Sequence, residues 1–375
     1  MTKPLLHKVL PCFALCALLN MAMTHLAYAE IHIAIASPLS GGEAVQGEEI
    51  RTGANMAIEK INAMGGVLGQ QVILDYLDDA CNATQATSVA NKIVSKPPVA
   101  VIGHLCSAAT MAAAPIYNEA NLPEITFSSN SQITEKGYKN LFRLIGRDDS
   151  QAPMLANSIS KTLKDNDKIA IIDDKSSWGV GFSDIAEGTF KSTITAPINI
   201  AMRDSIAVGQ KDFSTLITKL KQNNITHVVL GLLHMEAGLM VRQAREQGFK
   251  GQFYGGDPIQ TPEFWKIAGE AAEGFQQTGP FDPQSTDKGK VIVASLKKAN
   301  GSIGIYTFYA YAAVETITQA IAVAGSVKNE AVIKALQDGR YETLLGRVSF
   351  DAKGDLNNFK YQMFIWHDGQ YSLVQ

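Results

Sequence analysis

Residues 101–110 read V-I-G-H-L-C-S-A-A-T, and this stretch carries the strongest indication of fold in the chain. An apolar, strand-like run ends abruptly in small polar residues, and a helical pattern begins after Ser107. A strand whose carboxyl end opens into a helix N-terminus is typical of α/β proteins, which place small anionic ligands there. The stretch also holds Cys106, so it bears on the redox environment as well.

Strand-like and helix-like segments alternate on both sides of this stretch. Their apolar spacing predicts strands of period two and helices of period 3.6. Because Gly65-Gly66 breaks the chain, the first predicted helix ends there. The first cycle is expected to contain strands at 31–39, 71–77, 99–103 and 124–127, and helices at 50–64, 84–95 and 108–120.

A second cycle follows residues 147–150, a polar R-D-D-S stretch that can cap a helix. Such βα repetition predicts parallel sheets covered by helices on both faces, with right-handed crossovers, in two lobes. We expect helices at 151–163, 182–190, 212–221, 236–247, 288–299, 307–324 and 329–337, and strands at 168–173, 198–202, 226–232, 251–255, 346–350 and 361–366.

The N-terminus has the pattern of a secretory signal peptide. Basic residues precede an apolar run at 9–23, and Ala27-Tyr28-Ala29 is a small-x-small cleavage signal. An uncleaved anchor is the alternative, but the run is shorter than the roughly 20 residues that span a bilayer. Lipid modification of Cys16 is a second alternative, and the large Leu15 before it argues against it. We expect cleavage after Ala29 and a soluble protein exported to the periplasm.

Length and charge restrict the class of protein. Removing 29 of 375 residues leaves 346, enough for two domains, and the net charge falls from −3 to −5 as Lys3 and Lys8 leave. The absence of a basic run argues against nucleic acid as a partner. The sequence contains no P-loop, dinucleotide fingerprint, H-E-x-x-H or G-x-S-x-G motif, so no cofactor, metal or catalytic residue is assigned.

Cys81 and Cys106 are the cysteines that remain after the predicted cleavage. In an oxidising compartment they can form a disulfide, which closes a loop of about 26 residues and contributes roughly 3–4 kcal/mol in the chain-entropy model. Two buried thiols are the alternative. A free Cys106 is the one candidate nucleophile, and a disulfide removes it.

Small polar residues gather at the ends of three predicted strands. They lie at 37–41, at Ser107 and at 128–131. Hydroxyl and backbone N–H groups at neighbouring strand ends can form a cradle for a carboxylate. Serine and asparagine also cap helices, and the spacing alone does not separate the two roles.

Longer tracts extend the pattern over almost the whole chain, and with them the chain resembles the periplasmic leucine/isoleucine/valine-binding protein family, the soluble receptors of ABC importers. The tracts that carry the resemblance are S-G at 40–41, T-G-A at 52–54, I-N-A-M-G-G at 61–66, D-D-A-C at 78–81, A-N-K at 90–92, V-I-G-H-L-C-S at 101–107, G-Y at 137–138, K-D-F-S-T-L at 211–216, R-Q-A-R at 242–245, A-G-E-A-A-E-G at 268–274 and K-G-D-L at 353–356.

The resemblance implies two Rossmann-like lobes that close on a ligand and are joined by crossovers near Asp148, Gln277 and Phe350. Lobe I is then residues 30–148 with 278–349, and lobe II is 149–277 with 350–375. The family's disulfide falls on Cys81 and Cys106 in this sequence.

The resemblance also implies a binding site. The α-carboxylate of an amino acid is expected at the Ser107 hydroxyl and at Asn130, and the α-amine at the Ser128 carbonyl and at Asp257. Each charge of a zwitterion taken out of water then has a partner. Ser129, which lies between Ser128 and Asn130 in the sequence, is expected in the same site.

Several expected site residues depart from the family pattern. Asp257 stands where the family has glutamate and Asn130 where it has threonine; Gln46, Trp178 and Leu233 stand at tyrosine positions. Aspartate reaches roughly 1.5 Å less far than glutamate. Trp178 keeps a flat apolar wall and Leu233 favours an apolar ligand, whereas Gln46 is either a polar contact or a solvated rim residue.

Together these features predict a monomeric receptor that binds an aliphatic amino acid and delivers it to an inner-membrane permease driven by an ATPase. A different amino acid, a small carboxylate or amide, and a ligand-sensing role are the alternatives. An enzyme is not expected.

Overall fold

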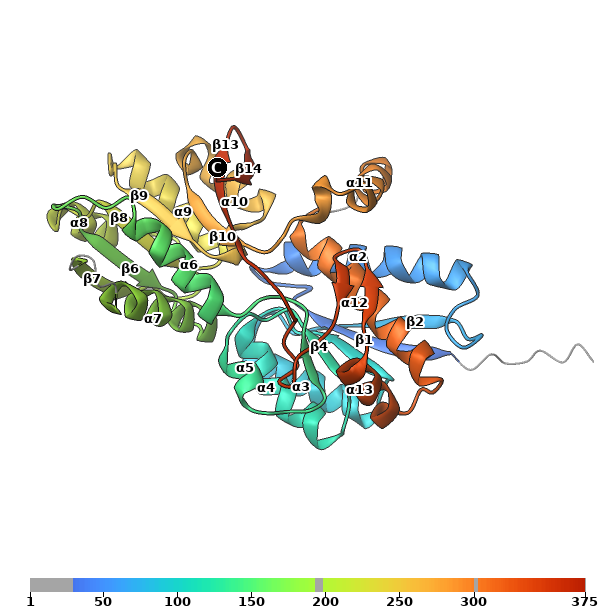
Figure 1. Ribbon diagram of the computed structural model, residues 1–375. Coiled ribbons are helices and arrows are strands. Elements are labelled where there is room, and N and C mark those ends of the chain that lie inside the picture. Colours follow the sequence, from blue (N-terminus) through green and yellow to red (C-terminus); the bar gives the residue numbers. More distant parts are fainter. Residues whose placement is uncertain (1–29, 193–197, 300–302, 375) are drawn as a thin grey trace, which may run out of the picture.

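The computed structural model describes residues 30–192, 198–299 and 303–374, so the predicted signal peptide lies outside the described residues. Within them the chain forms two lobes, each built on its own β-sheet (Figure 1). The predicted α/β class with two sheets is confirmed. The described part of the chain contains no helix that is both long and apolar enough to span a membrane.

The first lobe is a five-stranded parallel sheet between two helical layers. Alternate side chains of β1 (Ile31–Ser37), which lies between β2 and β3, face opposite layers: Ile33 and Ile35 pack with the helices at 44–63 and 305–324, and Ala34 and Ala36 with those at 83–95 and 107–119. The strands lie in the order β2 (Val72–Asp78), β1 (Ile31–Ser37), β3 (Ala100–Gly103), β4 (Glu124–Thr126) and β5 (Leu141–Arg143). The helices are α2 (Ala44–Ala63), α3 (Ala83–Ser95), α4 (Ser107–Glu119), α5 (Gln132–Glu135), α11 (Asp287–Ala299), α12 (Ile305–Ala324) and α13 (Asn329–Asp338).

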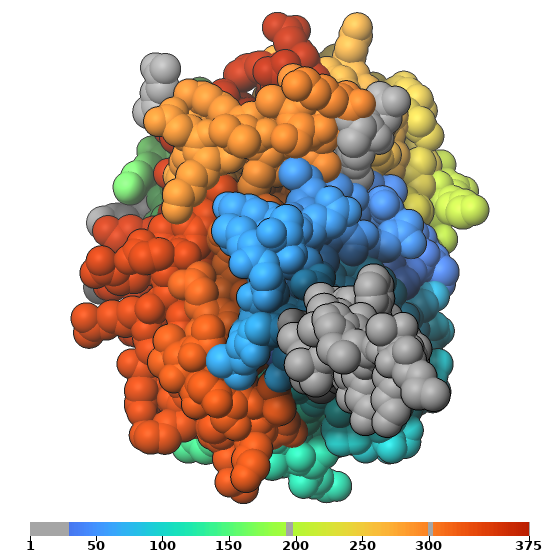
Figure 2. Space-filling model, turned by 90° about the vertical axis from the view of Figure 1, so that its right-hand side faces the viewer, coloured from blue at the N-terminus to red at the C-terminus, as the bar shows by residue number. Residues whose placement is uncertain are grey.

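The outer face of this lobe brings together segments that are far apart in sequence. The blue segment that contains α2 and the orange-red segment that contains α12 and α13 lie side by side, and α2 packs directly on α12 (Figure 2). A two-stranded hairpin, β11 (Tyr341–Thr343) with β12 (Gly346–Val348), follows α13. The C-terminal part of the chain therefore completes the N-terminal lobe.

The second lobe is a seven-stranded mixed sheet. Helices α6 and α7 cover one face, and α8, α9 and α10 the other. The strands lie in the order β14 (Gln370–Leu373), β13 (Gln362–His367), β10 (Gln276–Gly279), β9 (Gln252–Gly255), β8 (His227–Gly231), β6 (Ile169–Asp173) and β7 (Ile200–Ser205). The helices are α6 (Asp148–Ser160), α7 (Ser177–Ser192), α8 (Ser214–Gln222), α9 (His234–Glu246) and α10 (Pro262–Ala268).

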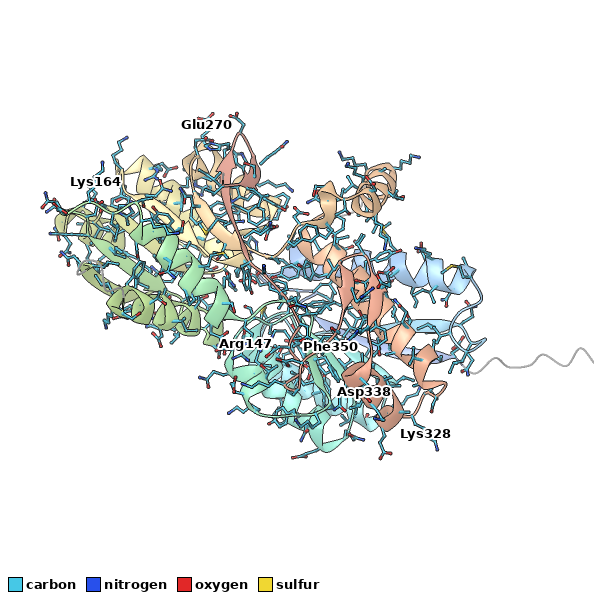
Figure 3. The ribbon with its side chains drawn as sticks, viewed as in Figure 1. Arg147, Lys164, Glu270, Lys328, Asp338 and Phe350 are labelled. Carbon is cyan, nitrogen blue, oxygen red and sulfur yellow. A yellow bond between two sulfur atoms is a disulfide. The ribbon has the colours of Figure 1, made fainter. Side chains whose placement is uncertain are left out.

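Three segments connect the two sheets, at 144–147, 280–286 and 356–361. Arg147 ends the first of these segments and lies at the junction in Figure 3, and Phe350 lies in the first lobe; Lys164 and Glu270 lie at the far end of one lobe and Lys328 at the far end of the other. We place the third crossover later than the expected position near Phe350. Asp355 still belongs to the first lobe, because its carboxylate forms a 2.7 Å ion pair with buried Arg143 of β5.

Most predicted elements exist in the structure, and several start elsewhere. Helix α2 begins at Ala44 rather than at residue 50, and the predicted strand at 346–350 forms a separate hairpin rather than part of a main sheet. Strands β5, β10, β11 and β14 and helices α5 and α10 were not predicted. The unpredicted elements are short, so they carry little periodic signal.

Gly103 ends β3 in a conformation that favours glycine. Its φ is +140°, and a Cβ atom there would lie 2.0 Å from the Ala36 carbonyl oxygen of the adjacent strand. The absence of a side chain therefore lets β1 and β3 stay paired up to the point where the chain turns toward Ser107.

Candidate ligand-binding site

A cavity of about 400 Å³ lies between the lobes, where the carboxyl ends of strands from both sheets face each other. This volume is in the range of small-molecule sites. The first lobe contributes Gly41, Gly42, Glu43, Gln46, Ala80, Cys81, Asn82, Leu105, Cys106, Ser107, Ala108, Phe127, Ser129 and Tyr306; the second contributes Ser176, Trp178, Val208, Gly209, Leu233, Met235, Glu236, Asp257 and Pro258.

A larger groove of about 750 Å³ lies beside the hairpin β11–β12 and the third crossover. It is lined by Arg340, Arg347 and Lys360 among others, and none of the eight residues expected in the site is among its described lining residues. The smaller cavity is the better candidate because both lobes and the predicted residues meet there.

Six of the eight residues expected in the site line this cavity: Gln46, Ser107, Ser129, Trp178, Leu233 and Asp257. Ser128 and Asn130 do not. The structure thus brings together residues from both lobes that are as far apart in the sequence as Gln46 and Asp257.

Ser107 presents its hydroxyl at the N-terminus of α4. It is the first residue of this 13-residue helix and is only 2% exposed. The N–H groups of the first helical turn have no intrahelical acceptor, and they favour a negative charge in front of them. In the described residues the Ser107 hydroxyl has no hydrogen-bond partner of its own. This corner of the cavity is therefore suited to a carboxylate.

The disulfide between Cys81 and Cys106 fixes the turn before Ser107, with the two Cα atoms 5.3 Å apart. Asp79 supports the same turn: its carboxylate accepts a hydrogen bond from the Cys81 N–H (2.8 Å) and lies 2.6 Å from His104 Nδ1. The disulfide removes Cys106 as a nucleophile, and buried His104 has a structural partner.

Ser128 and Asn130 lie behind the cavity wall and have partners inside the protein. The Ser128 carbonyl, expected to receive the ligand amine, accepts a hydrogen bond from Arg143 Nη1 at 2.9 Å. The Asn130 side chain donates to the Ser177 carbonyl of the other lobe at 2.7 Å. Both residues therefore have hydrogen-bond partners within the protein, as buried polar groups usually do.

Asp257 is the carboxylate that the second lobe presents to the cavity. It follows β9 and is 3% exposed. Gln151 donates to its carboxylate at 2.8 Å and accepts from its backbone N–H at 2.7 Å. Burial raises the pKa of Asp257 to about 6. A cationic group in the cavity would favour the ionised form of this carboxyl.

Apolar side chains line much of the rest of the cavity. Leu105 and Phe127 come from the first lobe, and Leu233 and Met235 from the second. Trp178 also lines the cavity and stacks on Phe182 with ring centroids 5.2 Å apart. These walls suit an apolar ligand side chain.

A polar contact joins the lobes at the edge of the cavity. His234 begins α9 in the second lobe, and its Nδ1 lies 2.9 Å from the Gln46 side-chain amide and 3.3 Å from Glu43 Oε2. Burial disfavours the charged imidazole, but neighbouring carboxylates, Glu43 first, outweigh it and raise the pKa of His234. Gln46 is therefore a lining residue that contacts the opposite lobe.

Sequence reasoning missed several lining residues. Tyr306, Glu43 and Glu236 lie at helix starts, and Val208 lies on a turn of the second lobe. Sequence reasoning took the polar residues before position 50 as a loop, although they form the first turns of α2. The available signal for Glu43 was the run of polar residues at 43–49, where α2 starts.

Comparison with known proteins agrees with this site. The model of the family described as periplasmic binding protein matches residues 30–370. The chain is 39% identical to the leucine-, isoleucine-, valine-, threonine- and alanine-binding protein of Pseudomonas aeruginosa, over 95% of each chain, and 38% identical to a Leu/Ile/Val-binding protein homolog of Brucella suis, over 93% of this chain and 94% of that one.

Solved structures resemble the whole described chain. A leucine-binding protein from Thermotoga maritima superposes with a TM-score of 0.82 at 25% identity, covering 92% of this chain and 98% of that one. A branched-chain amino acid transporter substrate-binding protein from Streptococcus pneumoniae, in complex with isoleucine, gives 0.81 at 25% identity, over 92% and 99%. The resemblance predicted from the sequence tracts is thereby confirmed, and the chain belongs to the periplasmic binding protein family, which consists of solute-binding receptors rather than enzymes.

Proposed function

We propose that this protein is the receptor of an ABC importer and binds an aliphatic α-amino acid between its lobes. The observation that carries the proposal is that Ser107 of one lobe and Asp257 of the other line the same ligand-sized cavity. The relatives named for leucine, isoleucine and valine support the choice of ligand.

In this proposal each end of the amino acid has its own partner. The carboxylate lies at the Ser107 hydroxyl and the first N–H groups of α4, and the ammonium group pairs with Asp257. Ser129 lines the same polar end. The aliphatic side chain contacts Leu233 and Trp178, whereas Gln46 contacts the ligand only at the edge where it meets His234.

A second candidate ligand is an amino acid whose side chain ends in N–H donors. Glu43 and Glu236 line the cavity together with Asp257, and no lysine or arginine is among its described lining residues. Glu43 has His234 as a partner, whereas Glu236 accepts one hydrogen bond, from the Gly209 N–H at 2.7 Å. A ligand amide could use the remaining acceptor capacity of Glu236.

Export and assembly belong to the same proposal. We infer that residues 1–29 direct the chain to the periplasm and are removed after Ala29, and that the monomer delivers its ligand to an inner-membrane permease with its ATPase. Family membership supports this placement. Mass spectrometry of the intact mature protein and size-exclusion chromatography test the cleavage site and the monomer.

The ligand can be identified directly. Denaturing the purified protein and analysing released metabolites by mass spectrometry should yield an aliphatic amino acid, and calorimetry should then rank leucine, isoleucine and valine against glutamine. Asp257→Ala should weaken binding by more than about 1.5 kcal/mol, because a charged hydrogen-bonding group is lost. Asp165→Ala, at an exposed turn of the same lobe, is the control. Unchanged affinity in the Asp257 variant contradicts the assignment.

A further inference from the structure

Two buried carboxyl groups next to the cavity share a single hydrogen-bond donor. Asp148, the first residue of α6, is 1% exposed, and Asp257 is 3% exposed. Gln151 Nε2 lies 2.8 Å from Asp257 Oδ1 and 3.3 Å from Asp148 Oδ1. One amide nitrogen therefore supplies its two hydrogens to two acidic side chains.

The orientation of this amide is fixed by its oxygen. Gln151 Oε1 accepts hydrogen bonds from the Asp257 backbone N–H at 2.7 Å and from the Thr278 hydroxyl at 2.9 Å. Both partners are donors, so the nitrogen must face the two carboxyls. Gly256 makes the approach possible, since a Cβ atom there would lie 2.6 Å from the same oxygen.

The charges that face Asp148 do not balance it. The residues acting on it are Asp257, Ser129, Arg143 and Trp178, with buried Tyr361 close by, and of these only Arg143 is a cation. The Arg143 guanidinium is already bound by Asp355 and by backbone carbonyls. In the described chain, neither Asp148 nor Asp257 forms an ion pair with a cationic side chain.

The groups that face Asp257 add no positive charge either. They are Asp148, the Gln151 amide and three tyrosines of the first lobe and the third crossover, Tyr306, Tyr309 and Tyr361. Two carboxyls held this close and out of water do not both ionise readily, so one keeps a proton. Burial, and then the charge of Asp257, raise the pKa of Asp148 to about 8.

Asp148 also contacts the cavity wall, although it does not line the cavity. Its Oδ1 accepts from Trp178 Nε1 at 3.3 Å, and its backbone N–H donates to the Ser129 carbonyl at 2.9 Å. Its Oδ2 is buried and has no partner in the described structure. Asp148 is thus placed to position Trp178, Ser129 and, through Gln151, Asp257.

Resting on the proposed amino-acid ligand, we propose that Asp148 is a positioning residue that holds the proton of the Asp148–Gln151–Asp257 cluster and releases it to solvent when a ligand ammonium group pairs with Asp257. The incoming cation stabilises both ionised carboxylates, so the carboxyl O–H bond of Asp148 breaks and the proton goes to water. Binding should therefore strengthen as the pH rises toward 8, until the cluster has lost its proton before binding.

The direct test measures proton release. Calorimetric titration of the wild-type protein with leucine at pH 7, in two buffers of different ionisation enthalpy, gives the protons exchanged per ligand. Asp148→Asn keeps the acceptor for Trp178 and cannot ionise, so it should release up to about one proton fewer than wild type. Relative to this variant, wild-type affinity should rise by up to about tenfold between pH 6.5 and 7.5. Because His234 is present in both wild type and Asp148→Asn, protons that it takes up on binding cancel when the two proteins are compared.

A matched control uses the next residue. Asp149 also lies in the first turn of α6 but is exposed and paired with Arg147, so Asp149→Asn should exchange protons as wild type does. Equal proton release by wild type and Asp148→Asn overturns the proposal. If the Asp148→Asn variant does not fold, titration of the aspartate carboxyl groups in the wild-type protein still tests the proposal.

That titration needs no ligand, because Asp148, Gln151 and Asp257 all belong to elements of the second lobe and are joined by hydrogen bonds within it. In protein labelled with ¹³C at aspartate carboxyls, one resonance should titrate between pH 6 and 9 and should be missing in Asp148→Asn. Titration of every aspartate below pH 5 overturns the proposal, even if leucine binds. Failure of all amino acids to bind, with the high titration present, contradicts the ligand assignment alone.

Discussion

Replacing His234 by asparagine tests how much ligand affinity comes from the contact between the lobes. His234 lies 3.3 Å from Glu43 and 2.9 Å from Gln46, and both partners belong to the opposite lobe. Asparagine can still meet Gln46 but carries no charge at any pH. The variant therefore removes the charge-assisted contact and leaves the rest of the edge polar.

The substitution is expected to make lobe closure less favourable and to leave the free energy of unfolding nearly unchanged. A hydrogen bond between charged groups contributes about 1.5–3 kcal/mol. Since opening returns Glu43 to water, this energy enters only when the lobes close, and His234→Asn should bind ligand about 10- to 150-fold more weakly at pH 6. The free energy of unfolding without ligand should change little.

The pH dependence has a definite sign. The closed structure raises the pKa of His234, so its contribution is fully present below the ordinary value near 6.5 and is lost as the pH rises through the raised value. The affinity gap between wild type and His234→Asn should close with increasing pH.

Calorimetry from pH 6 to 9, with small-angle scattering to follow closure, measures both effects. His227→Asn is the control, because His227 is half-buried at the start of β8 and contacts its own lobe. Equal affinities of the His234 variant and wild type at pH 6, or the same loss in the His227 variant, would refute the reasoning.

Three further changes have expected outcomes. Cys106→Ser should lower the free energy of unfolding by roughly 3–4 kcal/mol by releasing the loop that Cys81 closes, and a reduced wild-type sample should match it in denaturant titration. Asn130→Ala, which removes the inter-lobe bond to Ser177 together with the Oδ1 acceptor of the Gln132 N–H, should weaken ligand binding by about 0.5–1.5 kcal/mol, as measured by calorimetry. Asp355→Ala should destabilise the protein by about 3–5 kcal/mol because two arginines lose a buried partner. In wild type, ion pairing outweighs burial and lowers the pKa of Asp355, so this contribution is present at neutral pH and lost on acidification below the ordinary value near 4; a pH series of urea titrations checks it.

The layered fold could be predicted because each layer has its own periodic pattern. In β1, isoleucine faces one helical layer and alanine the other, so the strand reads as a buried run bounded by polar residues. Strand β10 could not be predicted in this way. Gln277 and Thr278 are fully buried in it, and their side chains bond Trp366 and Gln151 rather than forming an apolar face.

The sequence could predict a lining residue of the cavity only where that residue closely follows the end of a strand. Ser107 and Asp257 follow β3 and β9 closely, and both line the cavity. Ser128 and Asn130 occupy equivalent positions after β4, yet Arg143 and Ser177 take their polar groups. The competing partners come from other elements, so no local pattern distinguishes a ligand contact from an internal one.

The same limit explains why the polar stretch at 147–150, which contains Asp148, indicated only a helix cap in the sequence. A polar run before a helix is consistent with capping, and Asp148 does begin α6. Its Oδ1 nevertheless accepts hydrogen bonds from Trp178 and Gln151 rather than from the N–H groups of the first turn. Capping would leave this group hydrated and ionised; burial beside Asp257 gives it a proton to lose. The residue that starts the second lobe is therefore also the one best placed to couple the binding of a cationic group to the pH of its surroundings.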